Sequence, residues 1–331
     1  MEQGTPRIGV DLTGGERSPE ELFEGILSLG RSLPKALQLV FFAPETHAHA
    51  LEKLYLENPP ACCIAFVPTQ EALSIYDPPL ISIKLKKRSP MMMALQHLKE
   101  GLLDAVVSIG NTGALLGGAT LLLKKIKSIK RPGLLALLPT MTHPLVVIDV
   151  GANVSCTALH LLQFAQMGIA YQKCLGIAEP KVALLNIGVE KDKGSKTMRE
   201  AYRRLESLNQ NDTAPVFVGN LEGREVFKGI VDVLVTDGVS GNILLKTTEG
   251  TTAFLLKKLV DIHPTPLAKE DTLIKLLDYA EYPGALICGI EGVVVKCHGY
   301  SNPKAIYHGI MGAQNLVKSQ FLQKLKIQLK H

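Results

Sequence analysis

The sequence contains no tryptophan, and aromatic residues make up only 5% of its 331 positions. This scarcity disfavours a nucleic-acid-binding surface built from stacked aromatic rings. Charged residues account for 20% of the chain and the formal net charge is +5, so a protein that coats nucleic acid is also disfavoured. Hydrophobic residues reach 46%, which excludes an intrinsically disordered chain.

Cysteine is also scarce. The six cysteines are too few for a disulfide scaffold, and none forms a C-x-x-C pair, so structural zinc sites and thioredoxin-type redox sites have no support. The nine histidines show no metal-ligand spacing, and we expect neither a metal nor a cofactor. No secretory signal is visible, which favours a cytoplasmic protein and predicts that Cys62 and Cys63 are buried thiols in a strand.

One stretch of nineteen residues, 105–123, lacks any charge and has the length of a membrane span. Polar residues and four glycines interrupt it, and its first half is β-rich whereas its second half is typical of a helix. We therefore expect a strand, a tight turn and a buried helix.

Short apolar runs alternate with amphipathic stretches along the chain, as expected for buried strands of a helix-covered parallel sheet. The predicted strands are 8–11, 37–43, 62–67, 105–109, 134–138, 145–150, 182–187, 216–218, 231–236 and 292–297. The predicted helices include 19–32, 91–103, 156–174 and 196–209. This alternation predicts one doubly wound, three-layer αβα domain over 1–331. A shift in composition, with Pro264, Pro266 and a cluster of charged residues, predicts a helix–loop–helix insertion at 253–282.

Glycine is abundant, with 29 residues, and seven predicted strand ends pair it with a polar side chain. The carboxyl ends of the strands form the ligand crevice of an open α/β sheet, and the helix N-termini there bind anions. Nevertheless, the P-loop, G-x-G-x-x-G and G-x-S-x-G motifs are all absent, and no covalent nucleophile stands out. The pattern predicts an enzyme that binds an anion.

Two basic clusters interrupt this apolar chain. The first contains Lys84, Lys86, Lys87 and Arg88, and the second contains Lys124, Lys125, Lys127, Lys130 and Arg131. Each is either a solvated face or part of an electropositive rim that attracts an acidic macromolecule or an anionic lipid.

The strand-end motifs together resemble those of the bacterial phosphate acyltransferase family of phospholipid synthesis (PlsX). They occur in the family's order and span residues 7–314. The motifs are Asp11-x-x-Gly14-Gly15, Gly110-Asn-Thr-Gly-Ala114, Asp149-Val-Gly-Ala-Asn-Val154, Leu185-Asn-Ile-Gly188 with Lys193-Gly194, Gly219-Asn-x-Glu-Gly-Arg224, Asp237-Gly-Val-x-Gly-Asn-Ile243 with Leu245-Lys-Thr247, and Lys296-x-His-Gly299.

The resemblance implies a homodimer whose fold is like those of the isocitrate/isopropylmalate dehydrogenases and the phosphotransacetylases. It also implies that the insertion 253–282 is a dimer or membrane contact. It implies that acyl-[acyl-carrier protein] and orthophosphate give acyl phosphate and free acyl-carrier protein. It also implies a peripheral enzyme at the inner face of the membrane, which supplies acyl phosphate to a membrane-bound glycerol-3-phosphate acyltransferase.

Phosphate attack on a thioester needs an anion cradle and an oxyanion stabiliser rather than an enzyme nucleophile. We expect Lys193 to neutralise phosphate or the oxyanion and Asn242 to donate to the same oxygen. His298 is either the proton donor to the thiol or a histidine with a structural role. The predicted phosphate- and substrate-binding residues are Asp11, Gly14, Gly15, Asn111, Thr112, Gly113, Asn153, Asn186, Gly188, Asn220, Asp237 and Gly241.

Aspartates at these ends are expected to orient donors, because bare carboxylates would repel phosphate. This applies to Asp11, Asp149 and Asp237. An acidic carrier protein gives the basic rim a partner, and we expect it at Lys84, Lys86, Lys87 and Arg88, and at Lys124, Lys125 and Arg131.

The chain departs from the family pattern in three places. Thr13 and Glu16 replace the Met and the second Asp of the first motif, Ser89-Pro90 replaces a Ser-Ser pair, and segment 257–282 is short and polar. Three other readings stay open: a phosphotransacetylase-like enzyme that uses acyl-CoA, a dehydrogenase on the related fold, and a non-catalytic protein that binds the carrier protein or membrane.

Overall fold

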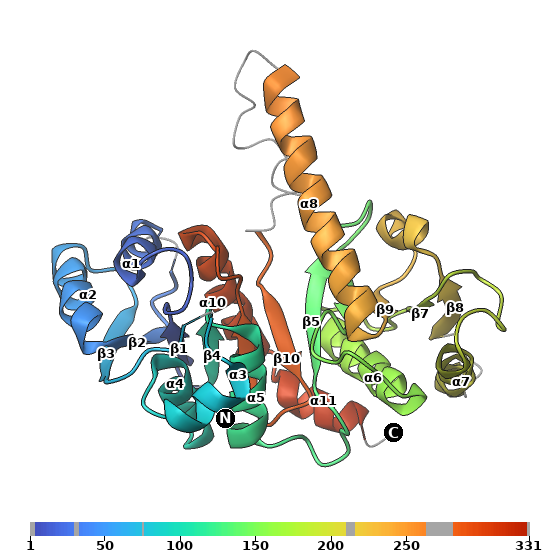
Figure 1. Ribbon diagram of the computed structural model, residues 1–331, viewed down its shortest axis with the longest axis horizontal. Helices are drawn as coiled ribbons and strands as arrows, with labels where there is room; N and C mark the ends of the chain where they lie inside the picture. The colour runs from blue at the N-terminus through green and yellow to red at the C-terminus, as the bar shows by residue number, and fades with distance from the viewer. Residues whose placement is uncertain (1–3, 30–32, 75, 210–215, 263–280, 330–331) are drawn as a thin grey trace. The chain divides into compact units, whose positions relative to one another are not determined.

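The computed structural model describes all residues except 1–3, 30–32, 75, 210–215, 263–280 and 330–331. The chain divides into two compact units. Unit 1 consists of Met1–Lys127 and Tyr282–Leu322, and unit 2 of Ser128–Glu281 and Gln323–His331. Each unit combines strands with flanking helices (Figure 1), which confirms the predicted α/β class. The expectation of a single domain over 1–331 stays a prediction.

The strands of unit 1 lie in the order β3-β2-β1-β4-β11-β10. Their bounds are Arg7–Asp11 for β1, Gln38–Pro44 for β2, Cys63–Thr69 for β3, Ala105–Ser108 for β4, Ala285–Cys288 for β10 and Val293–Lys296 for β11. The first five strands in this order are parallel, and β10 is antiparallel to β11. All four residues of β4 and of β11 are buried, because helices cover the central strands.

Two groups of helices cover the strands of unit 1 (Figure 1). One group contains α1 (Pro19–Ser28), α2 (Glu45–Glu57) and α10 (Pro303–Lys318), and the other contains α3 (Pro79–Leu85), α4 (Pro90–Lys99) and α5 (Thr112–Leu123). Stretch 105–123 thus forms strand β4, a turn and helix α5, as expected. Among the described residues, no helix combines the length and the apolar character needed to cross a membrane.

The strands of unit 2 lie in the order β5-β6-β9-β7-β8. Their bounds are Gly133–Leu138, Leu145–Ile148, Val233–Val235, Val182–Leu185 and Phe217–Leu221 in that order. Helix α6 (Ala158–Cys174) packs on β6, β9 and helix α7 (Lys196–Leu205), whereas α8 (Gly238–Ile262) packs on β5 and β6. Unit 2 also contains two 3-10 helices, η2 (Glu206–Asn209) and η3 (Gly223–Lys228), and helix α11 (Phe321–Gln328) follows α10 near the end of the described residues.

The structure differs from the sequence-based expectations in three details. The pairs β5–β6 and β10–β11 are antiparallel, because short connections join their strands and a parallel crossover needs a longer one. Strand β10 was not predicted. Cys62 is buried but precedes β3, and Cys63 lies in β3 but is exposed. The prediction of two buried strand thiols is therefore wrong for the strand position of Cys62 and for the burial of Cys63. Of the predicted insertion 253–282, residues 253–262 end α8, and 263–280 lie outside the described residues.

Candidate active site

Three neighbouring parallel strands of unit 1 end in polar residues. The strand register places Asp11 beside Ser108 and Ser108 beside Lys296, so β1, β4 and β11 end side by side. All three side chains are buried, with exposed fractions of 1% for Asp11, 0% for Ser108 and 8% for Lys296. In each unit, we use the term carboxyl edge for the edge of the sheet at which the parallel strands have their C-terminal ends. At the carboxyl edge of unit 1, an acid, a hydroxyl and a base are thus buried together.

Asp11 holds the loops that follow β1 and β4. Its Oδ1 accepts hydrogen bonds from Thr13 N at 3.0 Å and Thr13 Oγ1 at 2.5 Å, and its Oδ2 accepts from Ser108 Oγ at 2.7 Å. Ser108 Oγ in turn accepts from Gly110 N at 3.1 Å. Burial raises the pKa of Asp11 above its ordinary value of 3.8, against the opposing effects of the Thr13 and Ser108 hydrogen bonds and the Lys296 charge. Asp11 therefore fixes the two loops through one backbone N–H donor and two hydroxyl donors, and its role toward a ligand stays a prediction.

Lys296 belongs to the Lys296-x-His-Gly299 motif and is a functional candidate to which the sequence pattern alone assigns no role. Its Nζ donates to the carbonyl oxygen of Ile109 at 3.2 Å and to that of Cys297. Its charge acts on the buried Asp11 carboxyl. The available signal was its position, because Lys296 is the only charged residue in the apolar run 292–297 and stands at its carboxyl end.

The loops after β1, β4 and β11 touch one another. Glu16 N donates to Gly299 O at 2.9 Å, and a Cβ added to Gly15 would lie 2.6 Å from that oxygen, so only glycine fits there. A Cβ on Gly14 would lie 3.4 Å from the Cα of Gly110. His298 is half-buried and its ring stacks on that of Tyr300, with centroids 4.9 Å apart.

The predicted residues after β4 begin helix α5. Asn111 is its N-cap, because its Oδ1 accepts from Ala114 N at 3.0 Å. Thr112 and Gly113 are exposed in the first turn, where backbone N–H groups have no partner within the helix. This turn can therefore present N–H groups to an anion.

In unit 2, Asp149 follows β6 and is fully buried. Its Oδ1 accepts from the backbone N–H groups of Leu134, Gly151 and Ala152 at 2.8–3.0 Å, and its Oδ2 accepts from Asn153 N and Nδ2, both at 2.8 Å. Burial raises the pKa of Asp149, and these hydrogen bonds oppose the shift. The Nδ2 of Asn153 also donates to Pro132 O at 2.8 Å, so its amide positions this turn.

Helix α8 begins directly against the Asp149–Asn153 turn. A Cβ on Gly241 would lie 1.9 Å from Asp149 O, and one on Gly238 would lie 2.4 Å from Asn153 O. Only glycine permits this approach, which explains why the two motifs occur together. Asn242 is exposed, and its side chain lies against Gly151, whose added Cβ would be 3.5 Å from Asn242 Oδ1.

Asn186 and Asn220 hold the loop that carries Lys193. Asn186 Nδ2 donates to Lys193 O and Asn220 Oδ1, both at 3.2 Å, and Asn220 Nδ2 donates to Glu190 O at 2.8 Å. The side chain of Lys193 is 46% exposed, and its Nζ lies 4.0 Å from Glu190 Oε2. The two asparagines thus act through the loop, whereas Lys193 is accessible to a ligand.

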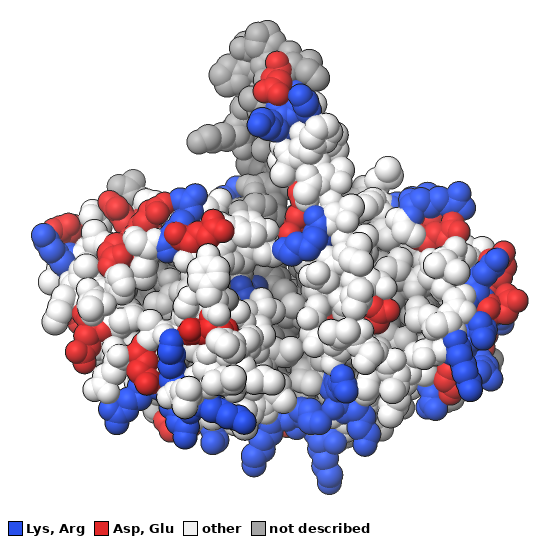
Figure 2. Space-filling view, in the orientation of Figure 1, with Lys and Arg blue, Asp and Glu red and all other residues white. Residues whose placement is uncertain are grey.

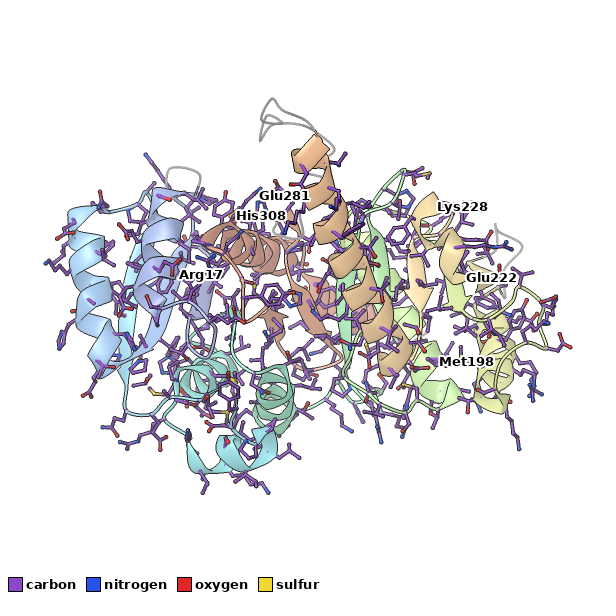
Figure 3. All side chains as sticks on the ribbon, turned by 45° about the horizontal axis from the view of Figure 1, so that its top comes forward. Arg17, Met198, Glu222, Lys228, Glu281 and His308 are labelled. Carbon is purple, nitrogen blue, oxygen red and sulfur yellow. The ribbon has the colours of Figure 1, made fainter. Side chains whose placement is uncertain are left out.

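A pocket of about 340 Å³ lies at the N-termini of α7 and α8 in unit 2. Ser195 caps α7 by accepting from Met198 N at 3.2 Å, and Asp237 accepts from Ser240 N at 2.8 Å at the start of α8. Both capping residues line the pocket, and Met198 marks the start of α7 in Figure 3. Two helix N-termini directed at one pocket favour an anionic ligand.

The cysteines near these motifs are poor nucleophiles. Burial raises the pKa of Cys156, which lines the 340 Å³ pocket, to about 11, and burial raises that of Cys297 to about 11 as well. Since the thiolate is the nucleophilic form, both groups are unreactive near neutral pH. The chemistry of the site therefore has to come from a substrate nucleophile or from the other polar groups.

The first basic cluster surrounds the end of α3 in unit 1. Lys86 Nζ pairs with Asp77 Oδ2 at 2.6 Å, and Arg88 Nη1 donates to Gln70 Oε1 at 2.7 Å, whereas Lys84 and Lys87 are exposed. Lys124 and Lys125 follow α5 and are exposed, and Arg131 is an exposed residue of unit 2. Basic side chains are visible near α3 and α5 in Figure 2.

Solved structures with similar folds show the fold class of the chain. A phosphotransacetylase from Streptococcus pyogenes is 16% identical, with a TM-score of 0.63 over 97% of this chain and 95% of that one. A 4-hydroxythreonine-4-phosphate dehydrogenase from Klebsiella pneumoniae is 14% identical, with a TM-score of 0.58 over 94% and 99%. At these identities the likeness shows the fold alone, which is the phosphotransacetylase- and dehydrogenase-like α/β fold that the resemblance implied.

Sequence comparisons define the family. A family model described as "Fatty acid synthesis protein" matches residues 6–324. A phosphate acyltransferase of Chlamydia abortus is 37% identical over 96% of this chain and 98% of the relative, and one of Thermotoga maritima is 38% identical over 98% and 97%. The chain belongs to this family of phosphate acyltransferases and is an acyltransferase enzyme, so a non-catalytic binding protein is excluded.

Proposed function

We propose that the chain transfers an acyl group from acyl-[acyl-carrier protein] to orthophosphate, giving acyl phosphate and free carrier protein. The observation that carries this proposal is the 340 Å³ pocket at the N-termini of α7 and α8, which the unreactive thiol of Cys156 lines. Such a pocket suits an inorganic anion that is itself the nucleophile. In the family context, orthophosphate is that anion.

The reaction needs positioning and charge stabilisation rather than covalent catalysis. An oxygen of hydrogen phosphate attacks the thioester carbonyl carbon, a C–O bond forms, and the C–S bond breaks. The proton of hydrogen phosphate leaves with the carrier-protein sulfur as a thiol, so the atoms and charges balance. The exposed Lys193 and Asn242 are proposed to stabilise the negative charge that develops on the carbonyl oxygen.

The buried carboxylates support this chemistry indirectly. Asp11 and Asp149 each accept several internal hydrogen bonds, so they fix their loops and do not face the phosphate as bare charges. Lys296 offsets the charge of Asp11 at the carboxyl edge of unit 1. For His298, proton transfer to the leaving thiol stays a prediction.

The surface of α3 supports a protein partner of acidic character. Leu80, Ile81 and Leu85 are 59–73% exposed, and the exposed Lys84 and Lys87 lie among and beside them. An apolar patch with a basic rim suits an acidic carrier protein, whose charge would guide association. We place carrier-protein docking at this α3 surface, defined by these five residues.

A homodimer, peripheral membrane association and delivery of acyl phosphate to a membrane-bound glycerol-3-phosphate acyltransferase belong to the same proposal. The family model's description and the phosphate acyltransferase relatives support this wider role in lipid synthesis. The family resemblance is what suggests these partners. Residues 263–280, at the predicted contact, lie outside the described residues.

The reaction is tested with purified chain, hexadecanoyl-[acyl-carrier protein] and hydroxylamine, with and without orthophosphate. We expect phosphate-dependent release of free carrier-protein thiol, with one trapped acyl group per thiol. A parallel reaction uses hexadecanoyl-CoA. Much faster reaction with the CoA thioester would replace the carrier-protein proposal by the phosphotransacetylase-like alternative.

The docking surface is tested with the double variant Lys84→Glu/Lys87→Glu. We expect KM for the acyl-carrier protein to rise about tenfold and activity with a small acyl-pantetheine thioester to stay unchanged, since only the protein partner senses this surface. Lys53→Glu/Lys99→Glu is the matched control, because it reverses two exposed lysines of unit 1 on α2 and α4. Equal effects of the two double variants would show a general charge effect without a defined docking surface.

A further inference from the structure

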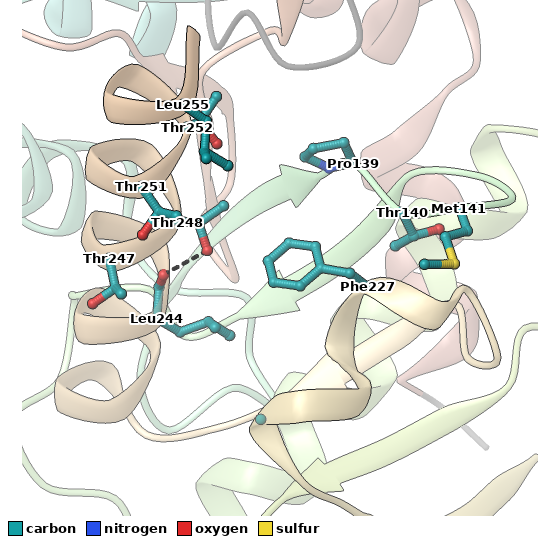
Figure 4. A pocket seen from close by; sticks show the side chains of 11 residues that line it. Pro139, Thr140, Met141, Phe227, Leu244, Thr247, Thr248, Thr251, Thr252 and Leu255 are labelled. Atoms are coloured by element: carbon teal, nitrogen blue, oxygen red, sulfur yellow. Dashed lines mark hydrogen bonds between the residues drawn. The ribbon is translucent and has the colours of Figure 1, made fainter. Parts of the chain in front are cut away.

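A second pocket of unit 2, of about 480 Å³, lies beside helix α8 and has no role in the chemistry described above. Its walls come from α8, from η3 and from the segment after β5 (Figure 4). Residues that line it include Met141, Phe227, Leu244, Thr248, Thr252 and Leu255. The volume lies within the range of small-molecule sites.

The α8 wall of this pocket is a single helical face. Leu244, Thr248, Thr252 and Leu255 are spaced at intervals of four, four and three residues, so their side chains lie above one another. From Leu244 to Leu255 the helix rises about 16 Å. The wall is thus elongated along the helix axis, as a linear ligand requires.

The lining carries no charge. Thr248 Oγ1 donates to Leu244 O at 2.8 Å within the helix (Figure 4), so this hydroxyl is satisfied by the backbone. Lys246 and Glu249, which lie on the same helix, pair with each other at 2.7 Å, and neither lines the pocket. The pocket therefore suits an uncharged, apolar ligand.

In two walls of the pocket, the lining residues closely follow polar motif residues of unit 2 in the sequence. Gly223 lines the pocket and follows Asn220 by three residues, and Leu244 follows Asn242 by two. Along the sequence, each of these two segments thus has an asparagine side chain first and a residue of the apolar lining two or three positions later. A ligand with a polar reacting end and an apolar tail matches this order.

We propose that this pocket binds the alkyl chain of the acyl thioester and sets the preferred chain length, an inference that rests on the proposed function. The absence of charge in the lining and the continuity with Asn220 and Asn242 favour the alkyl chain over a second copy of the chain. Burial of each methylene in the pocket is expected to raise kcat/KM about fourfold until the pocket is full.

The test compares Thr252→Phe with the wild type on butanoyl, octanoyl, dodecanoyl and hexadecanoyl thioesters of the carrier protein. The phenyl ring fills the pocket, so we expect kcat/KM for hexadecanoyl to fall by about tenfold or more and that for butanoyl to change by less than about twofold. Ala253→Phe is the matched control, because it adds the same ring at an exposed neighbouring residue that does not line the pocket. This control should keep the wild-type chain-length profile.

Met141→Lys provides a second variant that does not depend on repacking. Met141 is 82% exposed and lines the pocket, so a lysine there should weaken hexadecanoyl transfer severalfold without unfolding the chain. An unchanged chain-length profile in both pocket variants would place the alkyl chain elsewhere, for example along the exposed Ile187 and Val189.

The outcomes separate this inference from the proposed function. No phosphate-dependent acyl transfer from any thioester would contradict the proposed function. Transfer that Thr252→Phe lowers equally for all chain lengths would contradict only the pocket proposal. A sedimentation change in Thr252→Phe with a wild-type chain-length profile would assign this face to contact between copies and would overturn the alkyl-chain assignment.

Discussion

At the carboxyl edge of unit 1, Lys296 is buried and donates to backbone carbonyls, whereas at that of unit 2 Lys193 is about half exposed and lies 4.0 Å from Glu190. The acids show less contrast, because Asp11 and Asp149 are both buried and hydrogen-bonded. The difference between the two lysines shows that the same residue type has a structural role in one unit and is accessible to a ligand in the other. Unit 1 uses its lysine to hold a network, and unit 2 leaves its lysine available for a ligand.

The largest effect on stability is expected at Gly241 of unit 2, where helix α8 packs directly against the backbone of Asp149. Gly241→Ala would place a Cβ 1.9 Å from Asp149 O, so we expect the free energy of unfolding to fall by about 3 kcal/mol. Gly250→Ala is the control in the same helix, because a Cβ there meets nothing within 4 Å and should stabilise α8 by about 0.5–1 kcal/mol. Urea denaturation measures both, and equal stability of the two variants would contradict the close packing.

The accessible groups of unit 2 should affect turnover without affecting stability. We expect Lys193→Ala and Asn242→Ala each to lower kcat by about 10²-fold, because each removes a group that stabilises developing charge. The free energy of unfolding should change by less than about 0.5 kcal/mol. Lys191→Ala is the control, since Lys191 lies in the same loop and pairs with Glu206 at 2.7 Å. Near-normal turnover in both test variants would move the reacting centre away from this loop.

Lys296→Met tests the expectation that the buried lysine of unit 1, unlike Lys193 of unit 2, contributes to stability. Removal of the buried ammonium leaves the Ile109 carbonyl without this donor and Asp11 without a nearby positive charge. We therefore expect the free energy of unfolding to fall by about 1–3 kcal/mol. Chemical denaturation of this variant and of Lys193→Met gives the comparison. The two lysines would be equivalent if both variants were as stable as the wild type.

The buried acid of unit 1 should show a characteristic pH dependence. Because the folded-state pKa of Asp11 is raised above 3.8, the folded chain binds this proton more tightly than the unfolded chain. Stability contributed by this group is therefore present below pH 3.8 and is lost as pH rises through the folded-state pKa. The wild type should lose stability relative to Asp11→Asn over that range, by at most about 1.4 kcal/mol per pH unit.

Asp77→Asn is the comparison variant, because the pKa of Asp77 is shifted in the direction opposite to that of Asp11. The hydrogen bond from Lys86 lowers the pKa of the half-buried Asp77, so its contribution is present above pH 3.8 and is lost as pH falls through the lowered pKa. The two wild-type-minus-variant differences should thus have opposite slopes with pH. Equal slopes in denaturation curves would contradict the burial of Asp11.

The smallest effect is expected for Thr13, which stands where the family usually has methionine. Thr13→Val removes the hydroxyl that donates to Asp11 Oδ1 and should cost about 1 kcal/mol, since the backbone N–H of residue 13 keeps its own bond. Ser18→Ala offers a control of similar size, because Ser18 Oγ accepts from Glu21 N outside the carboxyl edge. A shift in the pH dependence of stability should accompany Thr13→Val and not Ser18→Ala.

The sequence predicted the strands and the strand-end glycines because both follow from local patterns. Apolar runs such as 134–138 appear as β5, and the close approach of Gly241 to Asp149 explains a motif that spacing alone had shown. Strand β10 was missed because a run of four residues after Pro283 and Gly284 gives little periodicity. The network of Lys296 depends on strand order, which no local pattern contains.

The place of β11 in unit 1 also has a consequence for synthesis of the chain. β11 pairs with β4, although 184 residues separate the end of β4 at Ser108 from the start of β11 at Val293. As the ribosome works from the N-terminus, one side of β4 has no partner until all of Ser128–Glu281 has been made. Unit 2 is nearly continuous in sequence and can assemble during this interval. A nascent chain stalled before residue 285 should therefore expose an unpaired strand edge, the kind of surface that chaperones cover.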